Sequence, residues 1–191
     1  MGRVRYGFSN LYYAVATEST TTAGALVYAS PVAVKGAKNL SMTASGTDIN
    51  EPADNTTWFT IKTNDGYTGT LEFEDTAAAD TFLTTILGQT KDANGGILEK
   101  ATDTPKEFAL LGQMELAGGT ETGKRACFYR CVASRPDVNA QTKEVGGLTI
   151  ATNTINITAI PRISDAAVKY TCDSTGSAYT NWFSAVPEKP A

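Results

Sequence analysis

Alternation of apolar and polar residues is the main pattern along the chain, and it predicts β-strands. Segment 67–74 (YTGTLEFE) is the clearest case, because its odd positions carry apolar residues or glycine and its even positions carry threonine or glutamate. Such alternation is typical of a strand with one buried and one exposed face. Similar patterns predict further strands at 11–17, 25–34, 38–45, 56–63, 107–116, 124–134, 148–160 and 167–171.

Three local signals refine these strands. Pro31 marks an edge or a break within 25–34, because proline cannot donate to a strand ladder. Asn64-Asp65-Gly66 stands between 56–63 and 67–74, and Asp-Gly between two strand patterns predicts a hairpin. Segment 148–160 is long for one strand, so we expect a bulge near 152–156.

One helix is predicted, at 76–87 (TAAADTFLTTIL). Asp75 or Thr76 can cap its start, and Gly88 stands where a helix commonly ends. Its apolar residues recur at helical spacing, which predicts a face that packs against a sheet. They are Ala78, Ala79, Phe82, Leu83, Ile86 and Leu87.

The fold class follows from these elements. We expect a mainly β domain, a β-sandwich or partly open β-barrel, with one α-helix at about 76–87 packed on the outside. The polar segment 46–55 carries turn-forming residues without periodicity and predicts a long loop. We divide the chain into an N-terminal arm at 1–10, a β-sandwich domain at 11–162 and a C-terminal segment or arm at 163–191.

Composition excludes several function classes. The 191 residues include no histidine, which removes Ser-His and Cys-His nucleophile pairs and histidine-bearing zinc sites. A net charge of −4 gives no basic surface for gripping nucleic acid. No apolar run approaches the length of a membrane span, and no signal peptide is evident after Met1. We therefore expect a non-enzymatic protein that folds in a cytosol, with no cofactor and no metal.

The three cysteines fit a reducing compartment. Cys127 and Cys131 are four residues apart on a predicted strand, roughly 13 Å between their Cα atoms, which is beyond disulfide reach. We interpret them, and Cys172, as small buried hydrophobic residues.

Apparent ligand motifs are weak. Segment 118–124 (GGTETGK) has the spacing of a phosphate loop, but Arg125 replaces the required Ser or Thr and a strand follows, so a hairpin turn is favoured. Asp92-Ala93-Asn94-Gly95 resembles the opening of a calcium loop but lacks its later ligands, which favours a turn. Glu72 and Glu74 share a strand face and could form a glycosidase pair, but an exposed acidic stripe is favoured.

The order of several segments resembles a known family. The segments are NLYYAVAT (10–17), VKGAKNLSM (34–42), TNDGYTGTLEF (63–73), ILG (86–88), KDANGGILE (91–99), KEFALL (106–111), RACFYRCVASRP (125–136), TKE (142–144) before a Thr-rich strand, and YTNWF (179–183). In this order and spacing they resemble the major tail protein, the tail tube subunit, of long-tailed bacteriophages with non-contractile tails.

The resemblance implies a structural virion protein. Subunits would form hexameric rings, and stacked rings would form a tube that conducts genome DNA during ejection. It also implies assembly in the host bacterial cytoplasm, location in the virion tail, and partners such as a tape-measure protein and tail terminator or distal tail proteins. DNA would pass through without sequence-specific binding, and no membrane would be involved.

Candidate interaction residues follow from exposure and charge. The 46–55 loop carries Asp48, Glu51 and Asp54, and we expect it to reach an adjacent ring or subunit. A plain mobile surface loop is the alternative.

Two further sets are candidates. Glu72 and Glu74 are candidates for an acidic face of the lumen, because a surface without cations lets phosphates pass. Trp182 and Phe183 are a candidate C-terminal anchor, either on their own fold or on a neighbouring subunit.

Two other functions stay open. The chain could be the tube protein of a contractile-tail apparatus, which would share the fold. It could instead be a ligand- or carbohydrate-binding β-sandwich module, which would not polymerise.

Overall fold

The computed structural model describes residues 2–138 and 152–189. It is mainly β, with one helix, and its sheet does not close into a barrel, which confirms the predicted fold class. The strands are β1 (Val4–Glu18), β2 (Leu26–Tyr28), β3 (Val32–Ala33), β4 (Ala37–Ser45), β5 (Asp48–Ala53), β6 (Thr56–Lys62), β7 (Gly66–Phe73), β8 (Thr90–Lys91), β9 (Ile97–Leu98), β10 (Phe108–Ala117), β11 (Gly123–Ala133), β12 (Asn153–Ala159) and β13 (Lys169–Asp173).

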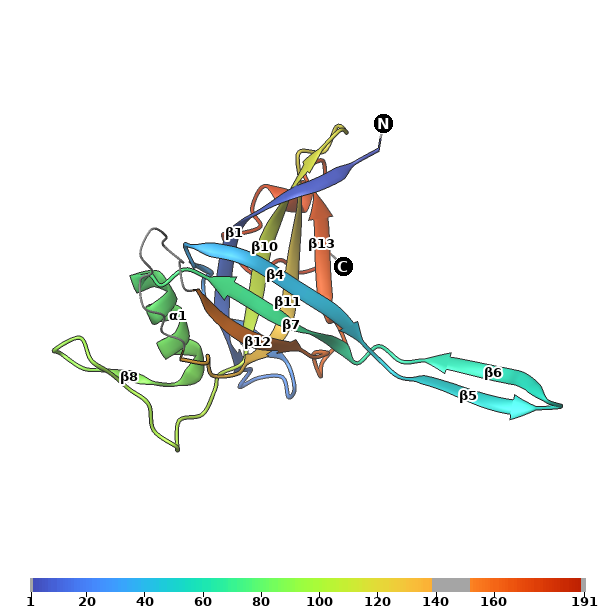
Figure 1. Ribbon diagram of the computed structural model, residues 1–191, viewed down its shortest axis with the longest axis horizontal. Helices are drawn as coiled ribbons and strands as arrows, with labels where there is room; N and C mark the ends of the chain where they lie inside the picture. The colour runs from blue at the N-terminus through green and yellow to red at the C-terminus, as the bar shows by residue number, and fades with distance from the viewer. Residues whose placement is uncertain (1, 139–151, 190–191) are drawn as a thin grey trace, which may run out of the picture.

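Two crossing layers form the body of the molecule (Figure 1). The hydrogen-bonded order is β2-β1-β10-β11-β12-β7-β4, with β13 beside β11 and β3 beside β1. In Figure 1, β4, β7 and β12 lie in front of β1, β10, β11 and β13. The sheet passes from the back layer to the front layer at β11, whose last residues pair with β12 while its first residues pair with β13.

The core lies between the layers and under the helix α1 (Ala77–Leu87). Phe82 of the helix is fully buried, and its ring lies 4.9 Å from that of Tyr13, 6.2 Å from Phe73 and 5.8 Å from Phe108, measured between ring centroids. One helix side chain therefore joins β1, β7 and β10, which explains why this stripe of the helix is apolar.

The helix ends as the sequence predicts. The Thr76 side chain accepts a hydrogen bond from the Ala79 amide, and Gly88 is left-handed with φ 73°. These contacts satisfy backbone groups that a helix terminus leaves unpaired.

The prediction for segment 46–66 is wrong in two respects. Residues 48–53 are not a loop but a strand, and 56–62 pair with them rather than with β7. The turn lies at Asp54 and Asn55, not at 64–66. Chain 37–73 is thus one long ribbon, with β4 paired to β7 in the body and β5 paired to β6 beyond it.

Gly66 shows why the Asp-Gly pair is not a hairpin turn. Its φ is +112°, and a Cβ built on it would lie 2.0 Å from the carbonyl oxygen of Ala159. The glycine is needed for the close approach of β7 to the end of β12. The preceding Asp65 amide still donates to the carbonyl of Ser45, so the ribbon continues through this point.

The predicted bulge at 152–156 is also wrong. From Asn153↔Phe73 to Ala159↔Tyr67 the β12–β7 register runs without a shift. The expected strand residues 148–151, like the TKE segment at 142–144, lie outside the described residues.

Both ends of the described chain join the fold. Residues 4–9, within the expected N-terminal arm, continue β1 and pair with β10 from Val4↔Ala117 to Ser9↔Gln113. The segment after β13 crosses the outer face of β1, β10 and β11, where it completes a second apolar cluster. No helix in residues 2–138 and 152–189 has the length and apolar character needed to cross a membrane.

Candidate assembly surfaces

The weak ligand motifs are turns in the structure. Segment 118–122 joins β10 to β11, as the hairpin interpretation predicts. In the β8–β9 connection, the Asp92 carboxylate accepts hydrogen bonds from the Asn94 and Gly96 amides. Asp92 therefore stabilises a turn. Across the described ranges, no group of three or more cysteine or acidic side chains could hold a metal ion.

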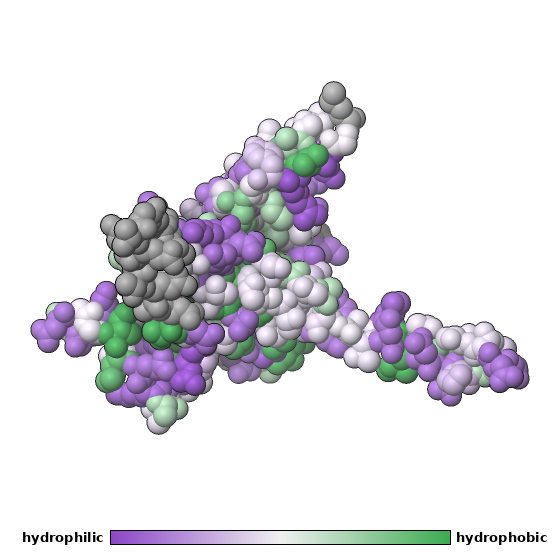
Figure 2. All heavy atoms as spheres, in the orientation of Figure 1, coloured by the Kyte–Doolittle hydropathy of each residue, from purple (hydrophilic) through white to green (hydrophobic). Residues whose placement is uncertain are grey.

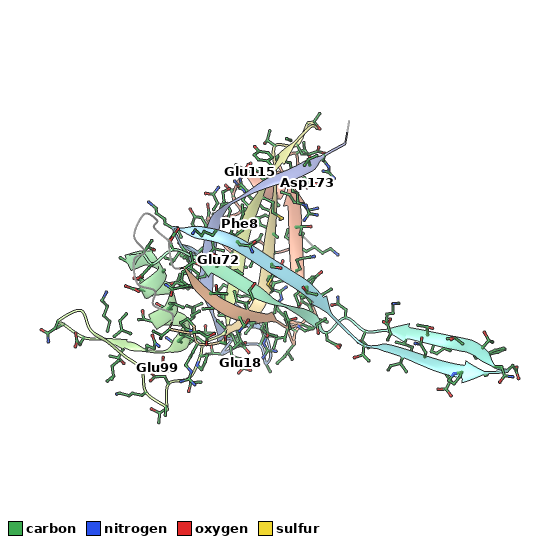
Figure 3. All side chains as sticks on the ribbon, in the orientation of Figure 1. Phe8, Glu18, Glu72, Glu99, Glu115 and Asp173 are labelled. Atoms are coloured by element: carbon green, nitrogen blue, oxygen red, sulfur yellow. The ribbon has the colours of Figure 1, made fainter. Side chains whose placement is uncertain are left out.

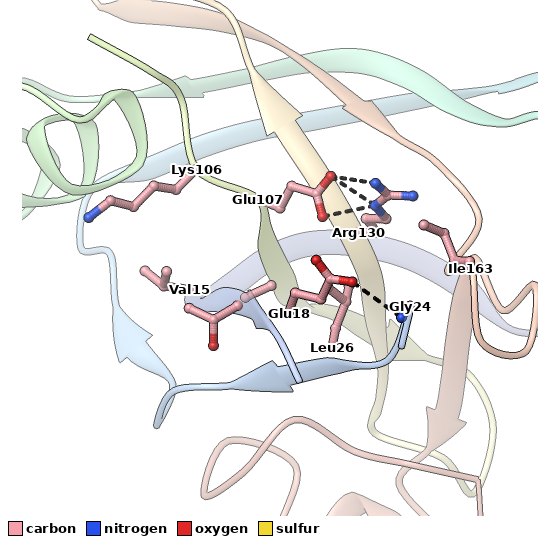
Figure 4. Close-up of a pocket in the computed structure, with 10 residues that line it drawn as sticks. Val15, Glu18, Gly24, Leu26, Lys106, Glu107, Arg130 and Ile163 are labelled. Atoms are coloured by element: carbon pink, nitrogen blue, oxygen red, sulfur yellow. Dashed lines mark hydrogen bonds and ion pairs between the residues drawn. The ribbon is translucent and has the colours of Figure 1, made fainter. Parts of the chain in front are cut away.

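A groove of about 510 Å³ opens beside β1 and β2 (Figure 4). Arg130 donates to both carboxylate oxygens of Glu107 at 2.7 to 2.9 Å, and the Glu18 carboxylate accepts from the Gly24 amide at 3.4 Å. Figure 4 shows Lys106 extending away from this ion pair. Glu107 and Arg130 are thus engaged with each other and Glu18 with a backbone amide, so the groove does not gather its charged groups around one ligand position.

The β5–β6 hairpin, residues 48–62, is the most unusual feature of the molecule. Figure 1 shows it projecting from the body, beyond the contacts of the two layers. Every residue of β6 is exposed, and Figure 2 shows apolar atoms on the surface of the projection. A two-stranded ribbon has no core of its own and is at best marginally stable in water.

The hairpin has one polar face whose groups are paired. Lys62 Nζ lies 2.8 Å from the Asp48 carboxylate, and the Thr60 hydroxyl donates to the Asn50 side-chain oxygen at 2.8 Å. The pair Asp48↔Lys62 and the pair Asn50↔Thr60 are two positions apart and therefore share a face.

The other face is apolar and exposed. Ile49 lies opposite Ile61, and Phe59 lies opposite Glu51, with exposed fractions of 52% for Ile49 and 57% for Phe59. Trp58 is 72% exposed and lies where the strand register shifts, between the Glu51–Phe59 pair and the Pro52–Thr57 pair. Exposed apolar residues gathered on one element are typical of a surface that binds a partner.

The three acidic residues predicted for this segment therefore have different positions. Asp48 is paired with Lys62 near the root of the hairpin, Glu51 lies on the apolar face, and Asp54 occupies the turn. Neither Glu51 nor Asp54 has an ion-pair partner within the described parts of the chain.

Glu72 lies on the outward side of β7, and Glu74 directly follows the last residue of that strand. The Glu72 carboxylate accepts from the Thr152 hydroxyl at 2.7 Å, and Glu74 forms an ion pair with Lys38 at 2.8 Å. Figure 3 shows Glu72 on the front layer. Glu74 is thus paired with a cation, whereas Glu72 has no ion-pair partner among the residues that the structure describes.

Glu72 belongs to a regular polar array. On β4, β7 and β12, residues of the outward face lie side by side in three ranks. The ranks are Asn39, Glu72 and Thr154; Ser41, Thr70 and Asn156; and Thr43, Thr68 and Thr158. The array contains hydroxyl and amide groups, one carboxylate and no lysine or arginine.

Trp182 and Phe183 dock on their own chain. Trp182 is fully buried and stacks on Tyr170 of β13, with ring centroids 5.4 Å apart. Phe183 stacks on Tyr12 of β1 at 4.5 Å. The Arg125 guanidinium lies over the Phe183 ring at 4.5 Å, a cation–π contact.

An ion-pair cluster fixes the end of the described chain. Arg162 binds Asp165 and Glu188, with Nη1 to Glu188 Oε1 at 2.6 Å, and its guanidinium lies 4.1 Å from the Tyr129 ring centroid. The hydrogen bonds from Arg162 lower the pKa of the Asp165 carboxyl. The Tyr129 hydroxyl donates to the Pro187 carbonyl at 2.8 Å.

Several strands leave an edge unpaired in the described structure. β4 pairs only with β7, and β13 pairs only with β11. The first residues of β1, 4–9, pair with β10 on one side only, since β2 and β3 begin their pairing beyond Leu11. Open edges can accept strands from another chain.

Comparisons with known proteins show a similarity to a solved structure. No family model matches the sequence, and no curated protein matches it. Among solved structures, the chain is similar to a chain of the anti-feeding prophage baseplate, determined by cryo-electron microscopy with six-fold symmetry. The TM-score is 0.46 at 10% identity, over 88% of this chain and 94% of that chain.

Sequence reasoning missed the exposed apolar residues of the hairpin as a surface. Ile49 stands within the segment expected to be a loop, and Phe59 and Ile61 stand in a strand expected to pair with β7. The signal that could have found them is the Asp54-Asn55 pair, because both residue types tolerate the left-handed conformation of a two-residue turn.

Proposed function

We propose that this protein is a structural, non-enzymatic subunit of a phage-type tail that assembles with copies of itself into rings stacked as a tube. The observation that carries the proposal is the β5–β6 hairpin, which exposes Ile49, Phe59 and Ile61 far from the body. Ordering such a ribbon is favourable when its apolar face is buried against another subunit. The family resemblance of the ordered segments supports the same function.

The rings follow from heterologous contacts. A hairpin that leaves one subunit and binds a different surface on the next makes a head-to-tail contact, which closes into a ring or continues as a filament. The unpaired edges of β4 and β13 are available for pairing between neighbours. The resemblance supplies six as the number of subunits in a ring, and a tape-measure protein and tail-end proteins as further partners.

The polar array is our candidate for the lumen lining. DNA phosphates gain affinity from each lysine or arginine that neutralises them, so a passage for DNA should present few cations. The array around Glu72 has none, and Lys38 beside Glu74 is already paired. The array would let DNA slide through the tube, from capsid to host, without sequence-specific binding.

Negative-stain electron microscopy over a concentration series, beside light scattering, tests the proposal. We expect rings or hollow tubes with a central channel, and class averages give the ring symmetry. A monodisperse monomer at every concentration, together with saturable binding to a glycan array, would overturn it in favour of a ligand-binding β-sandwich. Tubes that bind the sheath protein of a contractile tail around themselves would instead indicate a contractile-tail apparatus.

A further inference from the structure

A second groove opens at the seam between the two layers of the body. Its volume is about 290 Å³, and it lies where β4 and β7 of the front layer face β1, β10, β11 and β13 of the back layer. Figure 3 marks Phe8 of β1 close to β4. We call it the seam groove, and its apolar lining is Phe8, Leu40, Met42, Tyr67, Met114 and Phe128.

Every charged residue that lines the seam groove is a cation. They are Arg5, Lys124 and Lys169. The Lys169 ammonium donates to the Tyr67 hydroxyl at 2.7 Å, a neutral partner, and Lys124 Nζ lies 3.8 Å from an Asp173 carboxylate that Arg3 also contacts. The groove therefore combines an apolar floor with a rim of incompletely neutralised positive charge.

The β5–β6 hairpin has the complementary character. On its apolar face, Phe59 lies directly opposite Glu51 on the neighbouring strand. The Cβ atoms of two such residues are about 5 Å apart, so the aromatic ring and the carboxylate are neighbours. The one cation of the hairpin, Lys62, is already held by Asp48. The charge that the apolar face presents is therefore negative.

The hairpin of the same chain does not reach this groove. Between β4–β7 and the hairpin, the ribbon is held by two backbone hydrogen bonds, from the Thr63 amide to the Thr47 carbonyl and from the Asp65 amide to the Ser45 carbonyl. In this arrangement the hairpin points away from the body. Folding it back would break those bonds. The occupant must come from another molecule.

We propose that the apolar face of the β5–β6 hairpin of one copy binds in the seam groove of a second copy. Phe59 fills the apolar floor, and Glu51 meets the cations of the rim. The inference rests on the proposed function, since it names the surface that receives the hairpin in the assembly. It also explains why the seam between the layers is left unfilled in a single chain.

Photo-crosslinking tests the contact. The variant Phe59→p-benzoylphenylalanine is mixed with ¹⁵N-labelled wild-type protein at a concentration where light scattering reports self-association, then irradiated, and crosslinked peptides are identified by mass spectrometry. We expect mixed-isotope crosslinks to peptides containing Met42, Tyr67 or Met114. The same probe at Thr60, on the opposite face of the hairpin, is the matched control and should not yield them.

The outcomes separate this inference from the proposed function. Self-association with crosslinks that map to other surfaces overturns the seam groove but not the assembly. A chain that neither self-associates nor crosslinks between copies overturns both.

Charge variants give a second, independent test. Glu51→Lys alone and the double variant Lys124→Glu with Lys169→Glu should each self-associate at least tenfold more weakly than the wild type, because like charges would face each other. In a mixture of the two, the native hairpin of one variant meets the native groove of the other, and the reversed charge of the second hairpin meets the reversed charges of the second groove. Opposite charges therefore meet at both kinds of contact, and we expect the mixture to self-associate again. Lys91→Glu, on exposed β8, is the control and should assemble normally. A mixture that stays monomeric while the control assembles would contradict the contact.

Discussion

Asp54 and Asn55 are adjacent and both left-handed, with φ values of 51° and 60°. Together they form the two-residue turn between β5 and β6, because consecutive positive φ values match the twist of a tight hairpin. The hairpin thus depends on local turn chemistry and on its paired polar face, with no core beneath it.

Changing the turn should therefore affect the hairpin alone. Asn55→Val places a β-branched residue in the left-handed region, which costs about 1–2 kcal/mol. We expect faster hydrogen exchange of the β5 and β6 amides and an unchanged melting temperature of the body. Asn55→Gly, which relieves the same strain, should retain or increase protection; equal exchange in both variants would refute this view of the turn.

Gly66 and Gly95 form a contrasting pair of left-handed glycines. A Cβ on Gly66 would meet the Ala159 carbonyl at 2.0 Å, whereas one on Gly95 meets nothing within 4 Å. Gly66→Ala should destabilise the body by several kcal/mol, because strand β7 or β12 must shift, and Gly95→Ala by about 1 kcal/mol. Urea denaturation measures both, and similar midpoints would contradict the close approach.

The two tryptophans should behave in opposite ways. Trp182 is fully buried on Tyr170, and its truncation to alanine should cost about 3–5 kcal/mol of folding free energy. Trp58 is 72% exposed, and Trp58→Ala should change the stability by less than about 0.5 kcal/mol. Thermal denaturation of the monomer checks both values; a stable Trp182→Ala protein would argue against the anchor.

Stability should fall at alkaline pH. Burial raises the pKa of the Cys127 and Cys131 thiols, so both stay protonated in the folded protein while the unfolded chain ionises. Their contribution is complete below about pH 8.5, the ordinary thiol pKa, and declines as the pH rises above it, by about 2 kcal/mol per thiol at pH 10. Urea midpoints at pH 7 and pH 10 measure the loss, and the double variant Cys127→Ala with Cys131→Ala should lose less between these pH values.

A cation in the polar array should change how assembled tubes treat DNA. Thr70→Lys places an ammonium in the middle rank beside Ser41 and Asn156. We expect tubes of this variant to retain short DNA duplexes with an affinity that falls steeply with salt, whereas wild-type tubes do not. Thr85→Lys on the helix is the control for a cation elsewhere. Equal retention of DNA by wild-type, Thr70→Lys and Thr85→Lys tubes would contradict the proposal that the polar array lines the lumen.

The parts of the fold that sequence predicts are those whose signals are local or periodic. The helix is recognisable because Thr76 and Gly88 cap it and Phe82 stands within an apolar stripe. The β10–β11 pair is recognisable because two apolar strand segments flank an evident turn at 118–123. Neither prediction requires knowledge of distant partners.

The hairpin escapes prediction for a physical reason. Residues 48–53 do not face a core, so nothing imposes the alternation that marks a half-buried strand. Asn64-Asp65-Gly66 carries a stronger turn signal than Asp54-Asn55, yet Gly66 is there to admit the Ala159 carbonyl. The seam groove combines residues from six strands and has no signature in the linear sequence.

The most direct test of the account is sedimentation velocity over a concentration series, comparing wild-type protein with the double variant Phe59→Asp and Ile61→Asp. Both substitutions are on the exposed face of the hairpin and leave its polar pairs and the body intact. We predict that the wild type forms progressively larger species as the concentration rises, while the variant sediments as a folded monomer throughout. Identical sedimentation of the two proteins would contradict the claim that this hairpin drives assembly.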